Sequence, residues 1–153
     1  MTSPLKDYGG LLSRRLNRTL HGRSVYRRQD VPGHNVVHGY NNPGTGDSVD
    51  FFGPKGESVY AAHDGTIRRI ADPGGKLSCV YINGKHVLTV YAHVSIKPGL
   101  RMGSLVQEGQ VIGWIGKKLK DPHLHFELYL RGKAVAGRTP KQLAKKITAA
   151  LGD

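Results

Sequence analysis

The chain has one cysteine, no long apolar run and few acidic residues. The first two shortages exclude an internal disulfide and a membrane-spanning helix, and the third leaves a strong positive charge. Cys79 is the only cysteine among 153 residues, so the chain cannot form an internal disulfide. It lies in the apolar run LSCVYI, which favours a place in the core over a role as nucleophile. No apolar run approaches the roughly 18 residues of a membrane-spanning helix. No apolar stretch follows the first charged residues either, so we expect neither a membrane span nor a Sec signal peptide.

The shortage of acidic residues leaves a strongly basic chain. Asp and Glu together number 11 against 23 Lys and Arg, which gives a formal net charge of +12. This charge predicts an acidic partner, either an anionic polymer of the cell surface or nucleic acid. Nucleic acid is the less favoured of the two, because the chain shows no motif that is typical of a nucleic-acid reader.

The basic residues gather near the N-terminus, where residues 1–30 hold seven Lys and Arg against two Asp. We interpret residues 1–33 as a basic N-terminal arm. It is either a solvated surface segment or a contact to the cell wall, to DNA or to a neighbouring subunit of a particle. Residues 34–153 are expected to form one globular domain, since the whole chain has 38% hydrophobic and 22% charged residues, which is typical of globular proteins.

Residues 34–135 consist of short β-rich runs separated by turn signals such as NNPGTGD, GPKG, DPGG and KPG. Asn83-Gly84, between two such runs, predicts a hairpin turn. This pattern favours a mainly β fold with an antiparallel sheet over an α/β fold. After the sheet, Thr139 suits an N-cap and Pro140 the first helical position, so an apolar stripe predicts a covering helix over residues 140–151.

The segment HLHFELYL, residues 123–130, alternates strictly between polar and apolar residues, which predicts a β-strand with one buried face. The apolar face holds Leu124, Phe126, Leu128 and Leu130. The other face holds His123, His125, Glu127 and Tyr129. Two imidazoles on one face of a strand lie about 6–7 Å apart. One of them can bind a metal while the other reaches a substrate beside it, although a solvated sheet face would present the same pattern.

Two further β-rich runs add polar residues of the same kind. The run VLTVYAH ends at His93, and the run SVDFF contains Asp50. An Asp, a lone His and a His-x-His pair suffice for one zinc ion and its catalytic partners, since hydrolytic zinc sites use three protein ligands and keep one position open. By strand parity, Tyr91 and Tyr129 are expected to line the groove beside these histidines. His63 is expected in a turn, and His86 on the surface of the hairpin.

The runs SVDFFGPKGESVYAAHDGTI, LTVYAHVS, GSLVQEGQVIGWIG and DPHLHFEL resemble, in order and spacing, the zinc metallopeptidases of the lysostaphin/LytM type. The resemblance covers residues 36–135. It implies an antiparallel β domain that cuts peptide bonds in bacterial peptidoglycan. It also implies that Asp50 and His125 are metal ligands and that His93 and His123 are catalytic histidines outside the metal's ligand set.

One ligand of that pattern is missing, because the family places a His four residues before the ligand Asp and this chain has Gly46 there. The turn-rich stretch between residues 38 and 50 reads as an insertion that loops out between ligand His and ligand Asp. His38 is the preferred third ligand because it is the nearer His to Asp50. His34, Asp47 and a degenerate site without metal stay open as alternatives.

These expectations combine into a zinc-dependent endopeptidase that cleaves peptide crosslinks of peptidoglycan, as a phage or prophage lysin would. Without a signal peptide, such an enzyme would reach the cell wall or the extracellular space through a lysis pore or as part of a virion. The alternative is a catalytically degenerate protein of the same fold that binds the wall or builds a phage particle.

Overall fold

The computed structural model describes residues 1, 4–5, 19–20, 23–24, 49–75, 78–116, 122–135, 145–146 and 149–150, and for residues 19–20, 23–24 and 49–52 the backbone alone. The strands are β1 (Thr19–Leu20), β2 (Arg23–Ser24), β3 (Val49–Phe52), β4 (Ser58–Tyr60), β5 (Gly65–Ala71), β6 (Cys79–Gly84), β7 (Val87–Ala92), β8 (Val94–Ile96), β9 (Leu105–Val106), β10 (Val111–Ile115), β11 (His123–Leu130) and β12 (Lys133–Ala134). All of their pairings are antiparallel. The mainly β, antiparallel class is therefore confirmed, and none of the described segments forms a helix with the length and hydropathy of a membrane span.

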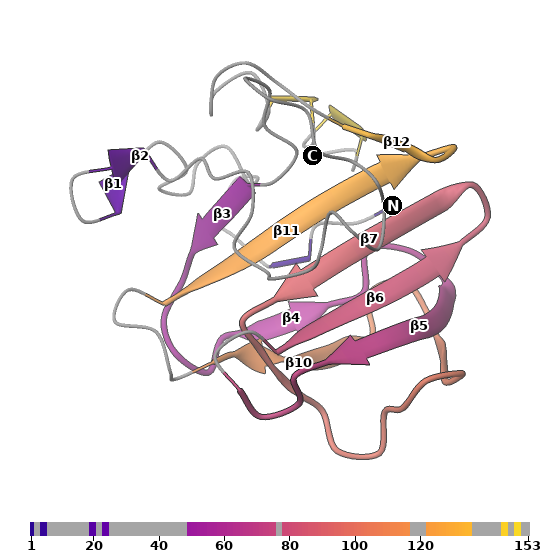
Figure 1. Ribbon diagram of the computed structural model, residues 1–153, viewed down its shortest axis with the longest axis horizontal. Coiled ribbons are helices and arrows are strands. Elements are labelled where there is room, and N and C mark those ends of the chain that lie inside the picture. Colours follow the sequence, from indigo (N-terminus) through magenta and orange to yellow (C-terminus); the bar gives the residue numbers. More distant parts are fainter. Residues whose placement is uncertain are drawn as a thin grey trace.

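The largest sheet has the order β12-β11-β7-β6-β5-β9, and β3 also pairs with β11 (Figure 1). Strand β11 is central to it. One edge of β11 pairs with β7 over residues 125–130, while the other edge pairs with β3 in its first half and with β12 in its second half. A second, three-stranded sheet has the order β4-β10-β8. Because β11 has neighbours on both edges, its side chains are held in a fixed register.

The main core is built from one face of the large sheet and from the three-stranded sheet. Leu124, Phe126 and Leu128 contribute from β11, and they share one buried cluster with Val59 of β4 and Ile112 of β10. The predicted strand over residues 123–130 is confirmed with the same bounds, and its apolar face is buried as predicted.

The opposite face of β11 was expected to be polar and solvated, or to carry a site, and it is buried as well. His123 is 3% exposed, His125 and Glu127 are 0% exposed, and Tyr129 is 1% exposed. A second apolar cluster lies on this face and contains Cys79, Tyr81, Leu88, Val90, Ala92 and Tyr129. The reading of a strand with a single buried face is therefore wrong, and the polar side chains of β11 occupy an enclosed environment.

The predicted hairpin joins β6 to β7, but its turn lies two residues later than expected. Gly84 pairs with Val87, so the loop consists of Lys85 and His86, and His86 is exposed with a left-handed backbone (φ 59°). Gly84 serves a different purpose. A Cβ at this position would lie 2.6 Å from His63 Nδ1 and 2.7 Å from the carbonyl oxygen of Asp64. The glycine therefore marks a close approach of two segments rather than the turn.

The first residues of the predicted basic arm contact the domain. The Pro4 carbonyl accepts a hydrogen bond from the backbone N–H of Tyr60 at 2.8 Å, and Leu5 is 1% exposed within the main core cluster. The amino group of Met1 lies 3.3 Å from the Glu108 carboxylate. At these residues the segment packs into the fold, so it is more than an accessory contact. The remainder of the arm's structure lies outside the described residues, apart from the backbone of β1 and β2.

Replacing Leu5 with Ala should lower the free energy of unfolding by about 2–5 kcal/mol, because a buried leucine loses its apolar contacts and leaves a cavity. Urea unfolding followed by circular dichroism measures this. Leu105→Ala is the matched control: Leu105 is 80% exposed, and its loss should cost less than about 0.5 kcal/mol. Equal effects of the two substitutions would show that residues near the N-terminus do not belong to the core.

The predicted C-terminal helix over residues 140–151 lies largely outside the described residues. Residues 145–146 and 149–150 have helical backbone, and Ala150 packs against the main core cluster. The helix as a whole, with its Thr139 cap, stays a prediction.

Candidate functional site

Three histidine rings meet where β7 ends and β11 begins. His93 directly follows β7, and His123 and His125 are the first and third residues of β11, which runs antiparallel beside β7 (Figure 1). The ring centroids of His93 and His123 are 4.8 Å apart, and those of His93 and His125 are 6.2 Å apart. All three rings are buried, and this placement brings together the three histidines that the sequence singled out for one site.

A left-handed backbone directs His93 to this cluster. Alternation along β7 would place residue 93 on the same face as Tyr91, in the main core. His93 has φ 63° instead, and its ring contacts those of His123 and His125, which lie on the opposite face. A positive φ is unfavourable for a residue other than glycine, and such residues concentrate at functional sites.

Two backbone hydrogen bonds hold His93 in this conformation. Its N–H donates to the carbonyl of Ser78 at 2.8 Å, and its carbonyl accepts from the N–H of Gly116 at 2.8 Å. The Ser78 hydroxyl also donates to the carbonyl of Val94 at 2.7 Å. A Cβ at Gly116 would lie 2.9 Å from the His93 carbonyl oxygen, so a larger residue there would have to displace His93. Sequence reasoning missed Ser78 and Gly116, because their role depends on contacts between distant segments.

Further along the same face of β11, His125 is in contact with a buried carboxylate. His125 Nε2 lies 2.7 Å from Glu127 Oε2, and the Tyr129 hydroxyl donates to Glu127 Oε1 at 2.5 Å. The alternation of HLHFELYL placed these residues on one face, but it assigned no role to Glu127. A carboxylate two residues after a candidate metal ligand is the signal that could have found it.

Asp50 lies opposite His125 in the pairing of β3 with β11, so the two positions share a face of the sheet. The third-ligand candidates His38, His34 and Asp47 lie outside the described residues, as does Gly46. Among the side chains that the structure describes, no three His, Cys, Asp or Glu groups form a complete metal site. The assignment of Asp50, His125 and His38 as ligands therefore stays a prediction.

The residues near this point are nevertheless of a kind that suits a zinc ion. Imidazole and carboxylate are both zinc donors. The ring atoms His93 Nε2, His123 Nε2 and His125 Nδ1 are buried, which places imidazole nitrogens in an environment shielded from bulk water. A zinc ion between the positions of Asp50 and His125 would fit this donor chemistry.

Two other expectations concern residues near the cluster. Cys79 is fully buried, and burial raises the pKa of its thiol to about 11, so it is a core residue as expected. The placement of Tyr91 in a groove is wrong. Its ring packs against Phe126 in the main core at a centroid distance of 5.4 Å, and its hydroxyl accepts the N–H of Ala62 at 2.9 Å. Tyr129 does lie on the face of the histidines, where it is 1% exposed and touches Glu127.

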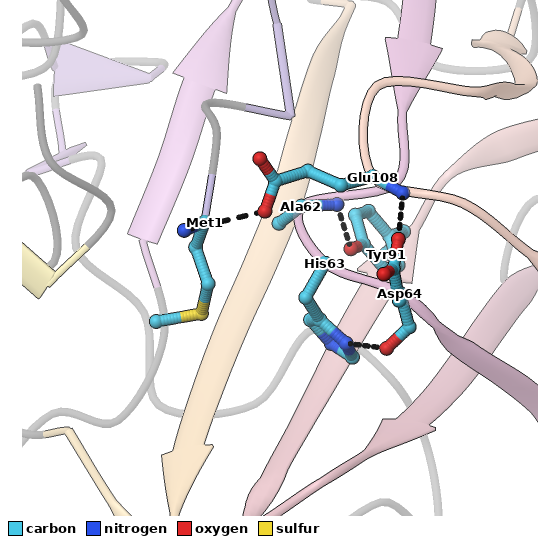
Figure 2. A network of polar contacts seen from close by, with 6 residues as sticks. All are labelled: Met1, Ala62, His63, Asp64, Tyr91 and Glu108. Atoms are coloured by element: carbon cyan, nitrogen blue, oxygen red, sulfur yellow. Dashed lines mark hydrogen bonds and ion pairs between the residues drawn. The ribbon is translucent and has the colours of Figure 1, made fainter.

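His63 is itself buried and lies in a bend, as expected, but belongs to a separate polar network, part of which Figure 2 shows. Its Nδ1 lies 2.8 Å from the carbonyl of Asp64, and its Nε2 lies 2.8 Å from the Thr89 hydroxyl, which is hydrogen-bonded to the hydroxyl of Tyr91. The Asp64 carboxylate accepts the N–H of Glu108 at 2.7 Å. Burial lowers the pKa of His63, and the hydrogen bond to Asp64 opposes this effect.

The lowered pKa of His63 predicts a pH-dependent stability. The folded state binds the proton of His63 less readily than the unfolded state, whose pKa is near 6.5. The stabilisation is therefore complete above about pH 6.5 and is lost as the pH falls through the lowered pKa of the folded state. We expect the melting temperature of the metal-free protein to fall more steeply between pH 8 and pH 5 than that of His63→Gln. Parallel curves for the two proteins would contradict the prediction.

Comparison with known proteins gives a consistent result. The model of peptidase family M23 matches residues 44–136. An uncharacterized metalloprotease of Haemophilus influenzae is 36% identical over 97 residues, which are 61% of this chain and 20% of the relative. Peptidoglycan DD-endopeptidase ShyA of Vibrio cholerae is 36% identical over 90 residues, which are 57% of this chain and 21% of the relative. The chain thus spans about a fifth of the length of these curated relatives.

Among solved structures, a zinc-containing peptidase from Vibrio cholerae superposes with a TM-score of 0.55 at 24% sequence identity. The superposition covers 90% of this chain and 38% of that one. At this identity the likeness shows a shared fold, and it agrees with the antiparallel β architecture described above.

Proposed function

The chain belongs to peptidase family M23, and from this premise we propose that it is a zinc-dependent endopeptidase that cleaves the peptide crosslinks of bacterial peptidoglycan. Membership confirms the resemblance seen in the sequence and implies a metal-dependent peptidase. The names of two relatives, a metalloprotease and a peptidoglycan DD-endopeptidase, support the substrate and the reaction. The observation that carries the proposal is the buried cluster of His93, His123 and His125 beside the position of Asp50.

In this proposal, Asp50, His125 and His38 would hold the zinc ion, with His34 and Asp47 as alternatives to His38. When bound, a zinc ion would polarise the scissile carbonyl and lower the pKa of a water molecule. Neutral His93 or His123 would accept a proton from the attacking water molecule. The resulting imidazolium stabilises the oxyanion or protonates the leaving amine. Imidazole suits both tasks because it exchanges its proton near neutral pH.

Digestion of purified peptidoglycan tests the activity. We expect the chain to release crosslinked stem peptides as shorter products with new amino termini, which mass spectrometry identifies. A chelator should stop the release and added zinc should restore it. Peptidoglycan with glycine crosslinks should be compared with peptidoglycan whose crosslinks consist of D-amino acids and a diamino acid. The comparison shows which of the two crosslink types the chain cleaves. Cleavage that continues unchanged in the chelator would contradict a metal-dependent reaction.

Gly116→Ala should lower cleavage by about 10–100-fold, because a displacement of a catalytic group by about 1 Å has effects of this size. The added methyl group would meet the carbonyl oxygen of His93 at 2.9 Å. Steady-state cleavage of a soluble crosslinked peptide measures the loss. Gly74→Asn is the control, since nothing lies within 4 Å of a Cβ there and Asn tolerates a left-handed backbone. Equal activity of the two variants would contradict the proposal that the backbone contact between Gly116 and His93 positions the His93 ring for cleavage.

The substrate also suggests where the chain acts. Peptidoglycan lies outside the cytoplasmic membrane, so we propose the cell wall or the extracellular space, including delivery by a phage particle. The net charge of +12 suits the anionic wall. Binding to purified walls should therefore weaken as salt rises, because the Debye length falls from about 10 Å at 0.1 M to about 3 Å at 1 M.

Gly46 favours one rival function, a degenerate wall-binding or particle-building protein of the same fold. Without a ligand at this position, or a replacement from another segment, the zinc would be held weakly. The rival predicts wall binding or assembly into oligomers with no bound zinc and no cleavage. Zinc content, size-exclusion mass and digestion of peptidoglycan by the same preparation separate the two functions.

A further inference from the structure

The contact between His125, Glu127 and Tyr129 bears on how a metal ligand would be oriented. The three residues alternate along β11, so they form a row on one face of the strand. Glu127 Oε2 lies 2.7 Å from His125 Nε2, and Glu127 Oε1 accepts the Tyr129 hydroxyl at 2.5 Å. Each side chain is at most 1% exposed, so bulk water does not compete for these hydrogen bonds.

Across the sheet, on β7, the residues beside Glu127 are apolar. Its neighbour across the sheet is Val90, and the next pair along is Tyr129 with Leu88. Val90 and Leu88 belong to the apolar cluster on this face of the sheet. Burying a carboxylate among such residues is costly, and an apolar residue of similar volume is often as stable or more so. Stability alone does not account for a glutamate here, so its contact with His125 is the feature to explain.

The chemistry of the contact determines the tautomer of His125. A carboxylate oxygen accepts hydrogen bonds, so the nitrogen that faces it carries the proton. A neutral imidazole with a proton on Nε2 has its lone pair on Nδ1. Nδ1 of His125 is therefore the ring nitrogen whose lone pair can bind a metal, and it is buried. A ligating histidine commonly has its second nitrogen bonded to a carboxylate, which sets the ring orientation and raises its basicity.

Resting on the proposed zinc function, we propose that Glu127 and Tyr129 are positioning residues for His125. Glu127 selects the Nε2-protonated tautomer and presents Nδ1 to the zinc ion. Tyr129 holds the carboxylate in place through its other oxygen and acts on His125 through Glu127.

The tautomer can be measured in the metal-free protein, independently of activity. The ¹⁵N shifts of His125 should show a protonated Nε2 and an unprotonated Nδ1 in the wild type. His125 and Tyr129 face different oxygens of the Glu127 carboxylate. Glu127→Gln replaces one of these oxygens with an NH2 donor, so it presents an acceptor to only one of the two residues. In this variant we expect loss of the single tautomer. Tyr129→Phe retains the carboxylate and should retain the wild-type tautomer.

Zinc affinity, measured by competition with a chromogenic chelator, gives the second readout. Glu127→Gln should bind zinc about 10–100-fold more weakly, the usual cost of losing such a partner of a ligand. Tyr129→Phe should lose less. The double variant should be no weaker than Glu127→Gln alone, because Tyr129 acts through Glu127.

Tyr91→Phe is the matched control, since it removes another buried tyrosine hydroxyl with a hydrogen-bond partner, but on the opposite face of the sheet. It should leave the His125 tautomer and the zinc affinity unchanged. A wild-type tautomer and wild-type zinc affinity in Glu127→Gln would overturn the proposal. If that variant does not fold, Tyr129→Phe decides, and a zinc affinity equal to that of Tyr91→Phe would overturn it. A wild-type chain that binds no zinc would instead contradict the proposed function, and the tautomer of the metal-free protein would still report on Glu127.

Discussion

His125→Ala should lose both zinc binding and peptidoglycan cleavage, whereas His123→Ala should lose cleavage and keep its zinc. The two residues lie two positions apart on one face of β11, but only His125 lies opposite Asp50 and in contact with Glu127. His123 lies instead against His93, at a centroid distance of 4.8 Å. Removing a group that transfers a proton should slow the reaction by about 10²–10⁴-fold. Removing a ligand of a three-ligand site should release the metal itself.

Zinc content by mass spectrometry and cleavage of a soluble peptide should be measured on the same samples of each variant. His86→Ala is the control, because His86 is exposed in the hairpin loop between β6 and β7. It should match the wild type in both measurements. Zinc lost from His123→Ala and retained in His125→Ala would reverse the assignment within the pair.

His38→Ala should weaken zinc binding far more than His34→Ala. The prediction rests on Gly46, which occupies the position where the family has its first ligand, and on the turn-rich stretch between residues 38 and 50, which we interpret as an insertion. A catalytic zinc site with two protein ligands retains too few bonds to hold the metal. Calorimetric titration of the metal-free variants with zinc measures the difference directly.

His63→Ala is the control for losing an imidazole, since His63 is engaged with Asp64 and Thr89 in a network of its own. It should bind zinc like the wild type, although it should be less stable at neutral pH. Equal zinc affinities of the His38, His34 and His63 variants would reject an upstream ligand. The remaining alternatives would then be Asp47 as the third ligand and a degenerate site without metal.

The strand that carries the site was predictable, and its environment was not. Strict alternation over residues 123–130 predicts the bounds of β11 and its apolar face. The same alternation leaves the burial of Glu127 undetermined, because burial of a polar face depends on what packs over it. The sequence named His93 through its resemblance, but strand parity would direct it into the core. The positive φ of His93 directs its ring to the opposite face, and this conformation depends on hydrogen bonds with Ser78 and Gly116. Ser78 precedes β6 and Gly116 follows β10, so sequence patterns around His93 do not indicate these contacts.

Glycines show the same limit of local reasoning. Asn83-Gly84 indicates a hairpin, and a hairpin is present, but the turn is Lys85-His86. Gly84 is needed because the His63 bend approaches its backbone, and only the folded structure reveals this contact. The third zinc ligand is even harder to predict from the sequence. Residues 34–47 contain three candidates, and sequence spacing cannot choose among them once an insertion interrupts the pattern.

Zinc held at Asp50 and His125 should drive cleavage, and zinc stoichiometry tests this most directly. The purified chain should contain a single zinc ion, lose it together with crosslink cleavage in a chelator, and regain both on addition of zinc. Zinc content and cleavage should rise in proportion during the titration. A folded chain that contains no zinc, takes up none and leaves peptidoglycan intact would contradict the account.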